Sequence, residues 1–139
     1  MKPWYRKFYF VTFLLVLCFA LSACQKGDGE VKKLKDLEFT VVEDADLPEK
    51  LMNYIEQKKE NPCKFTYSNE DYLFIVQGYG GQKSGGYSIS VNELFLTENA
   101  IYIKTNLVGP GKDEPVTQNI TYPYVVVKLE YMDKPVYFK

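Results

Sequence analysis

Residues 72–77 read Tyr-Leu-Phe-Ile-Val-Gln, and this almost entirely apolar run decides the fold class. β-Branched and aromatic residues are enriched in strands, and a run without polar alternation is typical of a strand that is covered on both faces. The run therefore predicts a central strand of a sheet. The strand is expected to end where a glycine-rich segment, residues 78–87, begins.

Further strand patterns lie on both sides of this run. Apolar and polar residues alternate from Tyr87 to Val91, which predicts a half-buried strand. The apolar phase then shifts to Leu94 and Leu96, so we expect a β-bulge near residues 92–93. Other strands are predicted at 37–43, 64–67, 100–108, 124–131 and 135–138.

One helix is predicted between the first two strands. Asp46 is its expected N-cap, Pro48 suits the first turn, and Glu49 would complete a capping box. Asn61-Pro62 should end it, because proline disfavours helix at the residue before it. The expected apolar face is formed by Leu47, Leu51, Tyr54 and Ile55. An N-terminal helix with a mainly antiparallel sheet or sandwich of about six to seven strands gives the α+β class.

The N-terminus has the features of a lipoprotein signal peptide. Its basic start is followed by an apolar run at 8–20, which is too short for a stable span of about 20 residues. Leu-Ser-Ala-Cys at 21–24 is typical of a lipobox. We therefore expect residues 1–23 to be removed and Cys24 to carry palmitate-type acyl chains. The alternatives are conventional cleavage and an uncleaved anchor. The predicted location is the bacterial cell membrane, lipid-anchored on its extracytoplasmic face, in the cell envelope.

The remaining chain is predicted to consist of a tether and one domain. Residues 24–36 are polar and contain glycine, which is typical of a flexible tether, and residues 37–139 would form a single α+β domain. The leader holds three of the 17 basic residues and none of the 18 acidic ones. The mature chain is therefore mildly acidic, which argues against a nucleic-acid partner.

The residue inventory argues against an enzyme. The chain has no histidine, so the candidate nucleophiles Cys63, Ser84 and Ser88 cannot form the usual triad. Carboxylate-only catalysis stays open as a minor alternative. The adjacent Asp113 and Glu114 lack the spaced oxygen ligands of a calcium loop. No catalytic residue, metal or cofactor is predicted.

Two loops are the candidate binding sites. The first is glycine-rich, and its candidate contact residues are Tyr79, Gly80, Gly81, Gln82, Lys83, Gly85, Gly86 and Tyr87. The second set is Gly109, Pro110, Gly111, Tyr122 and Tyr124. Phosphate binding is disfavoured because a strand pattern, not a helix, follows the glycines. A structural role for the glycines, which allow positive φ angles and close approach, is the main alternative to protein binding.

The second half of the chain resembles the C-terminal domain of the PrcB-like family over about residues 73–138. The resemblance depends on Gly-Gln-Lys-Ser-Gly-Gly-Tyr-Ser-Ile-Ser-Val at 81–91, Gly-Pro-Gly at 109–111, Thr-Tyr-Pro-Tyr at 121–124 and Pro-Val-Tyr-Phe at 135–138. It implies a non-catalytic protease-complex subunit, because the family's named member is a lipoprotein that stabilises a cell-surface serine protease. We thus expect a membrane-tethered, protein-binding lipoprotein whose partner is an exported protease or another envelope protein. The alternative is an inhibitor-like module that uses the glycine-rich loop.

Overall fold

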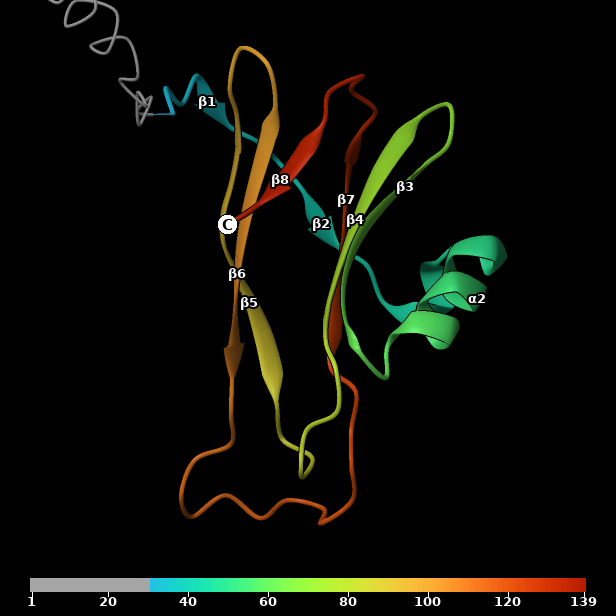
Figure 1. Ribbon diagram of the computed structural model, residues 1–139, viewed down its shortest axis with the longest axis vertical. Coiled ribbons are helices and arrows are strands. Elements are labelled where there is room, and N and C mark those ends of the chain that lie inside the picture. The colour runs from blue at the N-terminus through green and yellow to red at the C-terminus, as the bar shows by residue number, and fades with distance from the viewer. Residues whose placement is uncertain (1–30) are drawn as a thin grey trace, which may run out of the picture. The chain divides into compact units, whose positions relative to one another are not determined.

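The computed structural model describes residues 31–139 (Figure 1). Residues 32–139 form one compact unit. The predicted signal peptide at 1–23 and the predicted lipidation site Cys24 lie outside the described residues. Within residues 31–139, no helix combines the length and the apolar character needed to cross a bilayer.

The described residues fold into two four-stranded sheets and one α-helix. Sheet A has the order β1-β5-β6-β8 and sheet B the order β2-β7-β4-β3. All pairs are antiparallel except β6 with β8, which is parallel. The elements are β1 (Lys35–Asp36), β2 (Thr40–Val41), η1 (Asp44–Asp46), α2 (Glu49–Lys58), β3 (Pro62–Ser68), β4 (Tyr72–Tyr79), β5 (Ser88–Leu96), β6 (Ile101–Val108), β7 (Tyr124–Glu130) and β8 (Val136–Phe138). The α+β prediction is confirmed.

Strand β4 lies inside sheet B and is packed on both faces. Successive side chains of a strand point to opposite faces, so β4 contributes to two apolar clusters. The cluster between the sheets contains Leu73, Ile75, Leu94, Ile101, Ile103, Val125, Val127 and Leu129. The cluster beneath α2 contains Leu51, Ile55, Phe74, Val76 and Val126. The prediction of a central, doubly covered strand at 72–77 is therefore confirmed.

The β-bulge in β5 is also where the sequence predicts it. The register with β6 shifts between Val91 and Glu93, so Asn92 is the extra residue. Ile89 before the bulge and Leu94 after it both belong to the packing between the sheets. The inserted residue therefore keeps the apolar side chains on one face although their spacing in the sequence changes.

The first predicted strand, 37–43, is wrong in its extent. Its residues leave β1 in sheet A and enter β2 in sheet B, so the chain pairs only briefly with each sheet (Figure 1). Leu37 N donates to Leu94 O at 2.9 Å, and Val42 N donates to Val126 O at 2.9 Å. The predicted tether, 24–36, extends too far, because Lys35–Asp36 forms β1. Residues 37–39, between β1 and β2, are called the crossing segment below.

The helix begins later than the predicted N-cap requires. Asp46 lies in η1, and α2 starts at Glu49 with Pro48 at its cap. Pro48 has ψ 135°, which turns the chain between the two elements, so Asp46 cannot cap α2. Tyr54 was expected on the buried face but is 55% exposed, with its ring 6.3 Å from that of Phe65.

Replacing Ile55 should test how much α2 contributes to stability. Ile55 is fully buried against sheet B, so Ile55→Ala should lower the free energy of unfolding by about 2–5 kcal/mol. Urea unfolding followed by circular dichroism measures this. The neighbouring Tyr54→Ala, at an exposed position, should cost less than about 1 kcal/mol. Equal losses at the two positions would contradict the packing described for α2.

Candidate protein-binding loops

Two connections cross between the sheets at the same end of the sandwich (Figure 1). Residues 80–87 lead from β4 in sheet B to β5 in sheet A, and residues 109–123 lead from β6 back to β7. Main-chain hydrogen bonds join them: Gln82 N donates to Thr121 O at 2.8 Å, and Thr121 N donates to Gln82 O at 3.1 Å. Gly85 N also donates to Thr117 O at 3.0 Å. The two connections thus form one ordered unit, called the loop end below.

Side-chain hydrogen bonds join the two connections to each other and the two sheets to each other. Thr121 Oγ1 donates to Ser84 O at 2.7 Å, which is a fourth hydrogen bond between the connections. Behind them, the hydroxyl groups of Tyr79 and Thr105 are 2.6 Å apart and join β4 to β6 across the sandwich. Each such bond contributes about 1 kcal/mol net. The two connections are therefore bonded to each other, and the sheets behind them are bonded as well.

The glycines at the loop end have structural roles. Gly80 and Gly86 have φ angles of 71° and 82°, in the region that other residues rarely adopt. A Cβ atom at Gly86 would lie 2.7 Å from Val116 Cγ1 and 3.0 Å from Pro110 Cβ. A Cβ atom at Gly85 would lie 2.6 Å from Thr117 Oγ1. The glycines therefore let the two connections approach each other.

The structure brings most of the predicted contact residues together. The ring of Tyr122 lies beside Gly81, and the ring of Tyr87 lies beside Gly109. Exposed positions from both connections include Gly81, Lys83, Gly86, Gly109 and Gly111. Gln82, Gly85 and Pro110 are partly buried between the connections, and Gly80 is buried.

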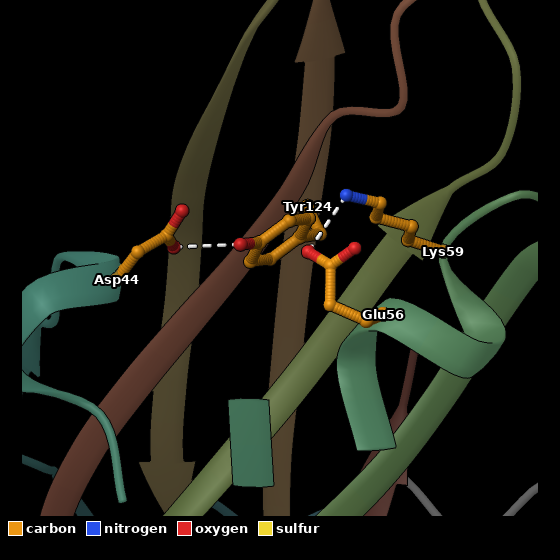
Figure 2. A network of polar contacts seen from close by, with 4 residues as sticks. All are labelled: Asp44, Glu56, Lys59 and Tyr124. Atoms are coloured by element: carbon orange, nitrogen blue, oxygen red, sulfur yellow. Dashed lines mark hydrogen bonds and ion pairs between the residues drawn. The ribbon is translucent and has the colours of Figure 1, made fainter. Parts of the chain in front are cut away.

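Two predicted tyrosines have other roles. The hydroxyl group of Tyr79 is used inside the sandwich, as described above. Tyr124 OH donates to Asp44 Oδ1 at 2.6 Å, so this side chain ties β7 to η1 (Figure 2). Neither hydroxyl group is directed at the exposed surface of the loop end.

Sequence reasoning missed the most exposed apolar side chain. Ile120 is 63% exposed, more than any other large apolar side chain among residues 31–139, and it lies in the exposed stretch 117–120. The sequence feature that could have identified Ile120 is its position as an isolated β-branched apolar residue in a polar connection. The two connections carry exposed charges of both signs, Lys83 and Lys112 together with Asp113 and Glu114. An exposed apolar side chain on a surface of mixed charge suits protein contact.

The pKa of Tyr124 is raised well above its usual value. Burial is the largest cause, followed by the hydrogen bond to Asp44 and then by the negative charges of Asp44 and Glu56. Glu56 also pairs with Lys59 at 2.7 Å (Figure 2). All three causes disfavour the phenolate. The native state therefore holds the Tyr124 proton more tightly than the unfolded chain does.

The raised pKa of Tyr124 predicts a loss of stability in alkali. The contribution is fully present below the ordinary tyrosine pKa, and it is lost as the pH rises from there toward the higher native pKa. Asp44→Asn should lower the native pKa of Tyr124, because it removes a charge. Ultraviolet titration of the folded protein measures this as a tyrosine that ionises earlier in the variant. An unchanged titration curve would contradict the coupling.

The surroundings of the candidate nucleophiles Cys63 and Ser84 do not activate them. Burial raises the pKa of the Cys63 thiol, which reduces its thiolate fraction at neutral pH. Ser84 Oγ donates to Gly85 O at 3.1 Å. Glu114 Oε2 accepts from Gly111 N at 3.0 Å and so closes a turn. Within the described part of the chain, no group of three or more Cys, Asp or Glu side chains gathers as metal ligands would.

The matched segment of a known family coincides with these loops. Residues 73–130 match the family described as PrcB C-terminal. This confirms the resemblance, although the match stops before β8 and covers less than half of the chain. The PrcB C-terminal segment runs from β4 to β7 and so includes both connections of the loop end. No curated protein and no solved structure matches the chain.

Proposed function

We propose that this chain is a lipid-anchored, non-catalytic subunit that binds and stabilises an exported protease through its loop end. Cys24 would hold it on the extracytoplasmic face of the membrane. The PrcB C-terminal match fits a role in a protease complex. The observation that carries the proposal is the loop end itself, where two connections are bonded together and present Ile120 to solvent.

An ordered loop end favours binding because little conformational freedom is left to lose. Fixing a flexible loop in a complex costs free energy. In this chain the hydrogen bonds between the connections already form when the protein folds, so binding does not have to order them. Ile120 and the exposed glycine backbone around Gly81 and Gly86 offer apolar and main-chain contacts. The surface therefore suits a protein partner better than a small charged ligand.

The glycine-rich loop suits the inhibitor alternative less well. An inhibitory loop has to lie in a protease cleft and offer its backbone to the enzyme. In this chain Gln82 N and O, Gly85 N and Ser84 O are already used by residues 117–121. The proposed contact is therefore centred on Ile120 and its neighbours, with the glycines supporting it.

Capture from native membranes tests the proposal. The tagged full-length protein, solubilised in mild detergent, should retain one dominant exported protease. Ile120→Asp should reduce that capture by about tenfold or more, because a charge would replace the apolar anchor at the contact. The protease should also be degraded faster in cells that carry this variant, since the complex stabilises it.

Tyr131→Asp is the matched control. Tyr131 is 46% exposed and follows β7 at the opposite end of the strands, so the same change there should leave capture unaltered. Failure to retain any exported protein under conditions that preserve other envelope complexes would refute the proposal. Equal losses of capture from both variants would mean that the loop end is not the contact surface.

A further inference from the structure

The lower half of β5 has a free edge on the side of the sandwich near β1 and β2. Strand β1 pairs with β5 only at Phe95 and Leu96, and Leu37 N adds one bond to Leu94 O. Among the described residues, no strand pairs with residues 88–91 on the side away from β6. This edge lies beyond the crossing segment, toward the loop end (Figure 1).

The main-chain groups on this edge follow from the antiparallel alternation. Ile101 N donates to Pro135 O, and Ile103 O accepts from Lys139 N, so the N–H and C=O groups of odd-numbered β6 residues are directed away from β5. The N–H and C=O groups of even-numbered β6 residues are then directed toward β5. Among these, Asn106 pairs with Ser90 and Val108 pairs with Ser88. The N–H and C=O groups of Ile89 and Val91 are therefore the ones directed at the free edge.

Several edges of the described sheets have protective features that residues 88–92 of β5 lack. Proteins protect edges with short strands, lysine, proline or covering segments. Strands β1, β2 and β8 have two or three residues each, and β3 carries Pro62 and Lys64. The open half of β6 has one charge, at Lys104, and its other residues, 105–108, are uncharged like those of β5. The groove described next distinguishes the β5 edge from this one. Residues 88–92 of β5, Ser-Ile-Ser-Val-Asn, have neither charge nor proline and end at the bulge.

An open groove lies beside this edge. It has a volume of about 340 Å³ and runs between Ile89 of β5 and residues 122–126 at the start of β7, with Val41 and Val42 along it. Asp44 is the one charged residue among the described residues that line it. The groove has a lining of both polar and apolar groups, with the polar surface the larger, and one negative charge, that of Asp44.

We propose that the free edge of β5 at Ile89 and Val91 takes up an extended segment of another exported protein as an added strand. Main-chain groups of an edge are matched by another peptide backbone. Side chains at alternate positions of the added strand point into the groove, so they are uncharged apart from a basic residue near Asp44. The inference depends on the proposed function only for the exported source of the segment.

A second copy of this chain fits the edge less well. In an edge-to-edge pair of β5 strands, Ile89 and Val91 of each copy would stay packed against their own inter-sheet cluster. The groove beside each strand would then remain unfilled. A separate segment fills the groove with its own side chains while it pairs with the edge.

Hydrogen exchange with a synthetic probe tests the inference. The probe is acetyl-Lys-Thr-Val-Thr-Val-Thr-amide, whose Lys and two Val side chains share one face of the strand, added to the full-length protein in detergent and followed by NMR. Saturating probe should slow amide exchange at Ile89 and Val91 by at least about tenfold and leave that of Ser90 unchanged. N-methylation of alternate probe amides blocks one edge of the probe, so one methylation pattern should abolish binding and the other should not. Replacing the probe's Lys by Glu should weaken binding.

Several results would overturn the inference. One is amide exchange at Ile89 and Val91 that the probe does not slow. Another is slowing at Thr105 and Leu107, on the β6 edge, in their place. The third is equal binding of both methylated probes. Slowing that appears without probe as the protein concentration rises would assign the edge to a second copy. Failure to capture a protease would refute the proposed function while leaving these results intact. Loss of probe binding with normal capture would refute the inference alone.

Discussion

Gly86→Ala should lower the free energy of unfolding by about 2–3 kcal/mol, a large loss for adding one methyl group. Gly86 has φ 82°, and its Cβ would lie 2.7 Å from Val116 Cγ1. The new methyl group therefore has to strain the backbone and separate the two connections. We also expect protease capture to fall with stability, because Ile120 lies in the connection that would move. Urea unfolding and capture from native membranes measure the two effects.

Gly111→Ala is the matched control in the same loops. Gly111 does not have a φ in the left-handed region, and its Cβ would make ordinary contacts with Glu114 at 3.8 Å or more. This change should stay within about 0.5 kcal/mol of the parent. Similar unfolding midpoints for Gly86→Ala and the parent, or an equal loss at Gly111, would mean that close packing of the connections does not hold the loop end together.

Cys24→Ala should abolish lipidation of the protein and the cleavage that precedes residue 24. The thiol is the predicted acyl acceptor, and each acyl methylene contributes about 0.8 kcal/mol to membrane binding. Without it, the variant should incorporate no radiolabelled palmitate and should not be cut at residue 24. The precursor would then run as a larger species in electrophoresis. Labelling and cell fractionation of the parent and the variant measure this.

Cys63→Ala serves as its control. Cys63 is half-buried on β3 and is the one free cysteine among the described residues. Its replacement should leave palmitate incorporation, cleavage and membrane retention unchanged. Palmitate on Cys24→Ala, or normal cleavage of that variant, would contradict the lipoprotein assignment and the location that depends on it.

Local patterns predicted most of the sheet because each depends on neighbours in the sequence. The apolar run at 72–77 became β4, buried on both faces. The phase shift between Val91 and Leu94 became the bulge. A strand pattern records which side chains are buried, and it needs no knowledge of which strand lies beside it.

Long-range geometry explains the predictions that were wrong. Residues 37–43 have strand-forming composition, yet they cross between sheets, and no local pattern marks that crossing. The N-cap prediction at Asp46 was wrong because Pro48 turns the chain before α2 begins. Tyr54 has the spacing of a buried residue, but it lies at the rim of the contact with sheet B.

The candidate site was predictable in its parts and not in its assembly. Both loops were identified from glycine and proline, which are typical of the turns and loops between strands. Their pairing joins Gln82 to Thr121, residues far apart in the sequence, and only folding brings them together. The same pairing left Ile120 exposed, whereas its neighbours in the sequence indicated only a polar connection.

Site-specific photo-crosslinking at residue 120 in living cells is the most direct test of the central claim, that the loop end contacts an exported protease. A benzophenone side chain at position 120 should give one dominant adduct with that protease. The same side chain at position 131, at the opposite end of the strands, should give none. No adduct at 120, or equal adducts at both positions, would contradict the account.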